Sequence, residues 1–299
     1  MKYFFSSLTF IFLLFTFQST SAQNIGIGTN APNSSALVEL QSTNSGFLPP
    51  RMSYSQRNSI VNPAQGLMIY CLDCGNIYGE PQYFNGSIWL NINGNRASAN
   101  YVNLPSIVVG SQIWNTSNLD VVTYSNGDPI PQVTNSTVWA SLTTGAWCWY
   151  NNDSTTYEAT YGRMYNWYAV NDPRGLAPYG WHVPTDAEWN KMTKYLDATV
   201  DTTCICGTGT SIGSQLKYTS GWNVSGNGTN SSGYAGLPGG YRGLNGVFGS
   251  VGYGGYWWTS TDFGATVGAW YRTLSNGTSK VYRNDANRLM GFSVRVLRN

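Results

Sequence analysis

Few side chains in this sequence could carry out chemistry, and five cysteines are the first of them. Cys71 and Cys74 form a CxxC pair, Cys204 and Cys206 form a CxC pair, and Cys148 is left as the odd thiol. Such pairs form disulfides in exported proteins, or bind Zn²⁺ where four thiolates converge. The two pairs are far apart along the chain, on what we expect to be separate domains. The spacing therefore favours two local disulfides over a zinc site or a redox-active CxxC, which would need a βαβ context.

The sequence offers few side chains that could act as a general acid or base. His182 is the only histidine, so a Ser-His-Asp relay would have to use it. Its place between two apolar residues, just before an expected helix, favours a buried, hydrogen-bonded structural role. Glu158 and Glu188 are both expected to cap helices, so no pair of carboxylates suggests glycoside hydrolysis. We therefore nominate no catalytic residue.

Metal and phosphate sites are also weakly indicated. Asp201, Asp262 and Asp285 lie in expected loops and could supply oxygen ligands to Ca²⁺, but no EF-hand-like spacing supports this. The Gly-rich stretch 233–255 lacks the element of a phosphate-binding loop. We expect no cofactor.

Aromatic side chains are the remaining candidates for function. The last third of the chain interleaves them with Gly, Ser, Asn and Arg, a composition typical of binding surfaces. In the pair Trp257-Trp258, a strand would point one ring inward and the other outward. We expect about half of these rings in the core, and the others to bind glycan or protein. The candidate ligand-binding residues are Trp222, Tyr256, Trp257, Trp258, Tyr271 and Tyr282.

The segment GWHVPTDAEW at 180–189 predicts a helix that would help to position these residues. Thr185 and Glu188 have the spacing of a capping box, in which each side chain satisfies a backbone N–H of the other residue. Trp189, Met192 and Leu196 follow on one helical face. We therefore expect a short, partly buried helix that begins at Thr185.

A second helix is predicted upstream, and strands elsewhere. Thr155 and Glu158 offer another capping box, followed by an apolar face of Tyr161, Met164, Tyr165 and Tyr168 that Pro173 would end. A strand is expected to begin at 107–109 and to continue at 112–114 after a break at Gly110. After about residue 205 no helical period persists, and further strands are expected at 256–258, 269–271, 280–282 and 292–296.

The chain divides into segments of different character. Residues 1–22 read as a signal peptide, because Lys2 precedes an apolar run that ends in small residues, and this run is too short for a good membrane span. Residues 23–92 alternate short strands with turns, 93–104 form a polar linker, and 105–299 form the second domain.

The composition supports export and gives no indication of a strongly charged partner. Charged residues are only 10% of the chain and aromatic residues 15%, as in loop-rich, β-rich extracellular modules. The formal net charge is +2, which gives no case for binding nucleic acid or anionic lipid. The sequence therefore predicts a secreted or cell-surface protein with an α+β second domain.

Several motifs in the second domain resemble a known family, the Fibrobacter succinogenes major paralogous domain. They are IWNTSNLD (113–120), WCWYNND (147–153), TYGRMYNWYAV (160–170), GWHVPTDAEW (180–189), LKYTSGWN (216–223), GLPGGYRG (236–243), GGYWWTSTDF (254–263) and GFSVRVLR (291–298). The resemblance implies a C-type-lectin-like fold, with two short helices and many short, twisted strands. VPTDAEWN and GFSVR are also similar to motifs of formylglycine-generating enzymes.

Departures from these relatives limit what can be carried over. Formylglycine-generating enzymes need two thiols late in the domain, and no cysteine follows Cys206 here. The EPN- or QPD-like triplet of sugar-binding C-type lectins is absent. Family members often pair the cysteine that corresponds to Cys148, but Glu158 and Val296 stand at the plausible partner positions. The resemblance leaves Cys148 either buried and inert, or paired within the Cys204/Cys206 insert.

The N-terminal segment has a resemblance of its own. GIGT, GFLPPRM, a QRN segment and an NG-x-W strand follow one another in 23–92, as in bacterial surface and phage-tail-fibre-like proteins. That similarity implies a homotrimeric fibre, because so short a segment has little apolar material for a core. A small β-appendage on a monomer is the alternative.

Three functions follow from these observations. The first is a secreted or cell-surface, non-catalytic binding module, an adhesin that contacts extracellular glycan or protein through its aromatic C-terminal half. The second is a structural component of a surface, matrix or fibre. The third, least favoured, is an enzyme on a formylglycine-generating-like fold.

Overall fold

The computed structural model describes residues 24–74, 79–94, 97, 104–264 and 268–299. The predicted signal peptide (1–22) lies outside the described residues, as does most of the predicted linker (93–104). The chain divides into one unit that ends at Pro49 and a second that runs from Pro50 to Asn299. The predicted segment 23–92 thus contains two separate sheets, and each part is described by itself below.

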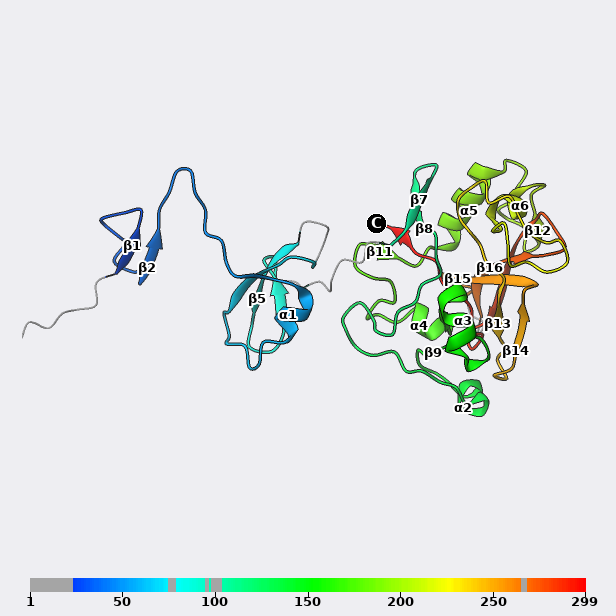
Figure 1. The fold of residues 1–299 in the computed structure, drawn as a ribbon, viewed down its shortest axis with the longest axis horizontal. Coiled ribbons are helices and arrows are strands. Elements are labelled where there is room, and N and C mark those ends of the chain that lie inside the picture. The colour runs from blue at the N-terminus through cyan, green and yellow to red at the C-terminus, as the bar shows by residue number, and fades with distance from the viewer. Residues whose placement is uncertain (1–23, 75–78, 95–96, 98–103, 265–267) are drawn as a thin grey trace, which may run out of the picture. The chain divides into compact units, whose positions relative to one another are not determined.

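The first unit is a single pair of parallel strands (Figure 1). β1 (Ile25–Ile27) pairs with β2 (Val38–Leu40). None of the described residues from 24 to 49 is buried. Parallel strands normally occur with both faces covered, so this unit has no core that could hold it together alone.

The second unit begins with a four-stranded sheet and one short helix. The strand order is β3-β4-β5-β6, with β3 and β4 parallel and the other pairs antiparallel. The bounds are Arg51–Met52 (β3), Tyr54–Asn58 (α1), Met68–Cys71 (β4), Glu80–Phe84 (β5) and Trp89–Asn91 (β6).

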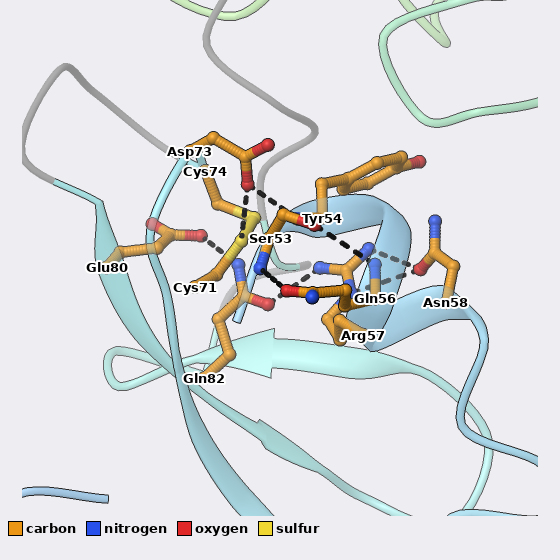
Figure 2. Close-up of a disulfide and its surroundings, with 10 residues drawn as sticks. All are labelled: Ser53, Tyr54, Gln56, Arg57, Asn58, Cys71, Asp73, Cys74, Glu80 and Gln82. Carbon is orange, nitrogen blue, oxygen red and sulfur yellow. Dashed lines mark hydrogen bonds between the residues drawn. A yellow bond between two sulfur atoms is a disulfide. The ribbon is translucent and has the colours of Figure 1, made fainter. Parts of the chain in front are cut away.

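Figure 2 shows how α1 is fixed against this sheet. Ser53 and Gln56 form a capping box, and the carboxylate of Asp73 accepts a hydrogen bond from the backbone N–H of Tyr54. Arg57 is buried, with its guanidinium 4.5 Å from the Tyr54 ring centroid, and it donates to Gln82. The helix therefore owes its place to polar contacts more than to apolar burial.

Residues 104–299 form an α+β domain around a six-stranded sheet. The order is β12-β17-β16-β15-β13-β14, in which β15, β16 and β17 form an antiparallel meander and β13 pairs with β15 in parallel. The bounds are Gly207–Thr208 (β12), Gly239–Arg242 (β13), Phe248–Val251 (β14), Gly254–Asp262 (β15), Gly268–Ser275 (β16) and Val281–Asn287 (β17). The strands predicted at 256–258 and 269–271 are confirmed as parts of β15 and β16.

The two ends of this domain meet in a second sheet of order β11-β18-β8-β7 (Figure 1). The strand expected to continue after Gly110 instead reverses there, at a φ of +60°, and forms the hairpin of β7 (Ser106–Val109) and β8 (Gln112–Asn115). β18 (Leu297–Arg298) lies between β8 and β11 (Trp181–His182). The strand predicted at 292–296 is mostly wrong, because this buried segment makes only isolated bridges before β18 begins.

The helix prediction at Thr185 is confirmed. Thr185 and Glu188 cap α5 (Asp186–Leu196) with both hydrogen bonds of the capping box, and Trp189 and Met192 are buried. The other elements are α2 (Ser136–Ala140), β9 (Trp147–Cys148), a 3₁₀ turn at Tyr150–Asn152, α3 (Ser154–Tyr161), β10 (Met164–Tyr165), α4 (Trp167–Val170) and α6 (Ile212–Leu216). The described part of the domain thus has more helices than the two expected.

The other predicted helix is wrong in its cap and its length. Asp153, not Thr155, caps α3, and Gly162 ends it at a φ of +65°, where a glycine is favoured. Met164 and Tyr165 then form β10, and Tyr168 belongs to α4, which Asn166 caps. The regular spacing of these apolar residues came from three successive elements, α3, β10 and α4.

None of the helices within the described ranges combines the length and the apolar composition needed to span a lipid bilayer.

Candidate binding face

The six candidate aromatic residues fall into two groups. Trp222, Trp257 and Trp258 are buried, with 4%, 1% and 0% of their surface exposed. Tyr256, Tyr271 and Tyr282 are half-buried. The tryptophans therefore offer no surface to a ligand, whereas the three tyrosines do.

The expectation that one ring of the Trp257-Trp258 pair faces solvent is wrong. The two rings do point to opposite faces of β15, but both faces are covered there. Trp257 packs against Tyr234, with ring centroids 5.7 Å apart, and Trp258 packs against Phe292 at 4.4 Å. Both rings belong to the core because β15 is a central strand between two apolar clusters.

Two of the half-buried tyrosines belong to a row of side chains across one face of the sheet. Thr273 in β16 lies opposite Tyr256 in β15 and opposite Tyr282 in β17, so all three share a face. Tyr241 in β13 extends the line, because its ring centroid is 5.2 Å from that of Tyr256. All four are half-buried. We call Tyr241, Tyr256, Thr273 and Tyr282 the tyrosine row.

Each tyrosine of the row lies against a glycine. A Cβ built on Gly207 would come within 2.5 Å of the Tyr282 ring, and one on Gly254 within 2.7 Å of the Tyr256 ring. A Cβ on Gly249 would lie 3.0 Å from Tyr241. Since a side chain at these positions would push the rings away, the glycines allow the rings to lie close to the backbone.

A further tyrosine lies next to the row. Tyr271 lies beside it, with its ring centroid 6.2 Å from that of Tyr256 in a stacked arrangement. Burial raises the pKa of Tyr271, and a hydrogen bond with the Asn284 side chain opposes that shift. Rings with hydroxyl and amide groups can stack and hydrogen-bond at once, which suits a polar, uncharged ligand.

The opposite face of the sheet is closed by α5 through ion pairs. Asp186 lies 2.8 Å from Arg272 and 2.9 Å from Arg283, and the Arg283 guanidinium lies 3.5 Å from the Trp270 ring centroid. Burial disfavours the charged carboxylate, but the two arginines outweigh it and hold the pKa of Asp186 below its usual value. This network fixes α5 to the face of the sheet opposite the tyrosine row.

His182 takes part in the cap of α5. Its Nδ1 lies 2.6 Å from Oδ1 of Asn299, and its Nε2 lies 3.0 Å from Oε1 of Glu188. Its side chain is 35% exposed, so it is less buried than expected. Through these contacts His182 joins Glu188, which caps α5, to Asn299.

The cysteines are placed as two local disulfides and one free thiol. Cys71 is joined to Cys74 and Cys204 to Cys206, while Cys148 is free and buried. Burial raises the pKa of the Cys148 thiol to about 12, against the opposing effect of Arg242. A thiol held neutral in this way is unreactive.

Among the described residues, one cluster of potential metal ligands is present, formed by Cys71, Asp73 and Cys74. Its two sulfur atoms are bonded to each other, so they cannot serve as thiolate ligands (Figure 2). The three aspartates considered for Ca²⁺ do not gather into such a cluster. Asp201 accepts hydrogen bonds from Thr203, Asp262 pairs with Arg288, and Asp285 lies exposed in β17.

The chain has a large α+β domain, preceded in sequence by two small sheets. Residues 107–298, more than half of the chain, match the family described as the Fibrobacter succinogenes major domain. The chain therefore belongs to this family.

A second match covers the N-terminal part. Residues 26–105 match a phage tail like trimerisation region, which is compatible with a trimer. The two matches together suggest a surface or fibre-like protein. Searches of curated proteins and of solved structures found no match to the chain.

Sequence reasoning overlooked part of the row. Tyr241 was one of the interleaved aromatic rings but not one of the six chosen candidates, and Thr273 was not considered, because its role depends on which strands are neighbours. One local signal existed: in Gly254-Gly255-Tyr256, glycine and tyrosine two apart on a strand share a face. Gly207 and Tyr282 are 75 positions apart in sequence, so no local pattern could have joined them.

Proposed function

We propose that this chain is an exported surface or fibre-like protein, whose trimeric N-terminal stem presents C-type-lectin-like domains that bind glycan without catalysing a reaction. The tyrosine row is the observation that carries this proposal. Its rings are held by glycines and by packing, so little conformational entropy is lost when a ligand binds.

The size of the row favours a short glycan over a protein. It crosses four neighbouring strands, which span about 14 Å at the usual spacing of about 4.8 Å between strands. A stable protein interface needs about 800 Å² on each partner, with large anchors at its centre. The half-buried tyrosines expose too little surface for that, but enough for sugar rings. Protein binding remains the second candidate for this face.

The stem accounts for the exposed apolar residues of the first unit. Ile27, Leu40 and Leu48 are 58%, 50% and 65% exposed and line a hollow of about 370 Å³. In a trimer, neighbouring copies would cover these side chains. This burial would supply the core that a parallel strand pair needs.

The test of binding is a glycan array with the mature chain. Tyr282→Ala should weaken a wild-type signal on the order of tenfold, as expected for removing a stacking ring. Tyr253→Ala is the matched control, because Tyr253 is a 51% exposed tyrosine outside the row. Equal losses in both variants would contradict binding by the row. Silence of the wild type, with its assembly retained, would favour a structural component.

The test of the stem is the mass of the mature chain in analytical ultracentrifugation. We expect a trimer for the wild type, and monomers for Leu40→Ser. Val61→Ser is the control, since Val61 is 84% exposed and lies outside the first unit. A monomeric wild type would leave the small-appendage alternative.

A further inference from the structure

The two disulfides differ in how far they are buried. Cys71 and Cys74 are both 0% exposed. Cys204 and Cys206 are half-buried, and Ile205 between them is 53% exposed. A disulfide is broken by a thiolate that attacks one of its sulfur atoms, so the rate depends on access to the sulfur. A dissolved thiol therefore reaches the Cys204–Cys206 disulfide of the folded protein more readily than the Cys71–Cys74 disulfide.

Two of the hydrogen bonds that hold segment 201–206 are long. The side chain of Asn190 in α5 donates to the carbonyl of Thr202 at 3.4 Å. The hydroxyl of Thr208 donates to the carbonyl of Asp201, also at 3.4 Å. Hydrogen bonds of this length restrain a segment weakly. The disulfide, which is covalent, is therefore a principal restraint on this segment.

The same segment ends where β12 pairs with β17. β12 has two residues and lies at the edge of the six-stranded sheet, with β17 as its neighbour. The backbone N–H of Arg283 donates to the carbonyl of Cys206 at 3.1 Å. The next residue, Gly207, is the register partner of Tyr282 and lies against its ring. The disulfide therefore restrains the residue that precedes Gly207, at one end of the tyrosine row.

We propose that the Cys204–Cys206 disulfide is a modification site for low-molecular-weight thiols, and that its opening loosens β12 from β17. The thiolate of the small thiol forms a bond with one of the two sulfur atoms, and the bond between Cys204 and Cys206 breaks. The other sulfur leaves as a thiolate and takes up the proton that the small thiol has lost. A second molecule of thiol then releases the first as a small-molecule disulfide and leaves both cysteines reduced, so two thiols supply the two electrons.

The opening of the disulfide acts on the tyrosine row through Gly207. Once the disulfide is open, the Cys206 carbonyl is free to move away from the Arg283 amide. Gly207 then no longer holds its position against the Tyr282 ring, and this end of the row is displaced. The thiol exchange goes beyond the function proposed above, and only its effect on glycan binding rests on that function.

The first experiment treats the folded, mature full-length chain with 2-mercaptoethanol, then alkylates it with iodoacetamide and locates the adducts by mass spectrometry. We expect adducts at Cys204 and Cys206, while the disulfide of Cys71 and Cys74 stays intact. Absence of adducts at Cys204 and Cys206, or equally rapid labelling of Cys71 and Cys74, would overturn the proposal.

Hydrogen exchange measures the link to β17. The Arg283 amide should exchange at least about tenfold faster in the thiol-treated chain, because local opening removes its acceptor. The Phe292 amide is the control, since it donates to the carbonyl of Tyr165 at 3.1 Å, away from β12, and its exchange should not change. Equal exchange of the Arg283 amide with and without thiol would overturn the loosening of β12.

Two variants separate the disulfide from the sequence around it. The double variant Cys204→Ser/Cys206→Ser should show fast exchange of the Arg283 amide without thiol, and no response to thiol. Ile205→Ser is the matched control, because it changes the exposed residue of the same turn and keeps both cysteines. It should behave as the wild type does. Equal exchange of the Arg283 amide in the two variants would contradict the role given to the disulfide.

The glycan array measures the effect on the row. Thiol treatment should weaken the wild-type signal, because the Tyr282 ring is displaced. An unchanged signal would show that opening of the disulfide does not reach the row. Silence of the untreated wild type would contradict the proposed function and not the modification site, which mass spectrometry and hydrogen exchange test without a glycan.

Discussion

The ring of Tyr282 lies directly against Gly207 of the neighbouring strand. The two residues are register partners in β17 and β12, and a Cβ on Gly207 would meet three ring atoms at 2.5–2.8 Å. The position of this tyrosine, and with it one end of the row, therefore depends on the absence of a side chain from a different strand.

This relationship predicts the effect of Gly207→Ala. The added methyl should displace the Tyr282 ring, weaken ligand binding, and cost about 1–3 kcal/mol of stability through overpacking. Gly277→Ala is the matched control, because no atom lies within 4 Å of its built Cβ. Glycan-binding assays and thermal melts of the two variants measure these effects. Equal behaviour of the two variants would contradict the role given to Gly207.

The cap and core of α5 predict graded losses of stability. Thr185→Ala removes the side chain that accepts from the Glu188 N–H, so it should cost about 1 kcal/mol, while Thr185→Ser should cost less. Trp189→Ala should cost roughly 3–5 kcal/mol, because the ring packs against Trp114 with centroids 5.0 Å apart. Denaturant melts measure all three. Wild-type stability of Trp189→Ala would contradict its place in the core.

Sequence patterns predicted correctly those features that residues close together in the chain determine. The cap of α5 depends on residues a few positions apart and was found from sequence, and so were the extended segments on either side of Gly110, but not the reversal between them. The exposure of Trp257 and Trp258 depends on what covers each face of β15. Phe292 covers Trp258 from a segment more than thirty residues away, so alternation along one strand could not reveal the burial of both rings.

The candidate binding face also could be predicted only in part from local sequence patterns. Tyr256, Tyr271 and Tyr282 were nominated from composition, which identifies rings suited to binding but not their neighbours. The row itself arises from the pairing of four strands. Contacts of such separation leave no short pattern in the sequence.

Asp197 predicts a dependence of stability on pH. Burial opposes its ionisation, but hydrogen bonds from Thr199, Thr210 and Ser211 outweigh that effect and hold the pKa of Asp197 well below its usual value. In acid, the unfolded chain therefore binds a proton before the folded chain does. The contribution of Asp197 is fully present above a pH of about 4 and is lost as the pH falls further toward the folded pKa.

Substitution tests this assignment. Asp197→Asn turns an amide toward backbone N–H donors, so it should cost about 1–3 kcal/mol at neutral pH and flatten the loss of stability below a pH of about 4. Asp285→Asn is the control for removing a charge, since Asp285 is exposed. Urea unfolding of the wild type and both variants, measured from neutral to acidic pH, gives the dependence of stability on pH. An unchanged acid slope in Asp197→Asn would place the titration elsewhere.

The disulfides and the raised pKa of the Cys148 thiol predict a pattern of alkylation. The folded protein should resist iodoacetamide at mildly alkaline pH, because the free thiol is buried and neutral. Unfolding without a reductant should expose one reactive thiol per chain, and unfolding with a reductant all five. Cys148→Ala should show no labelling until a reductant is added. Mass spectrometry counts the adducts, and labelling at Cys71 or Cys204 without a reductant would show that the local disulfides do not form.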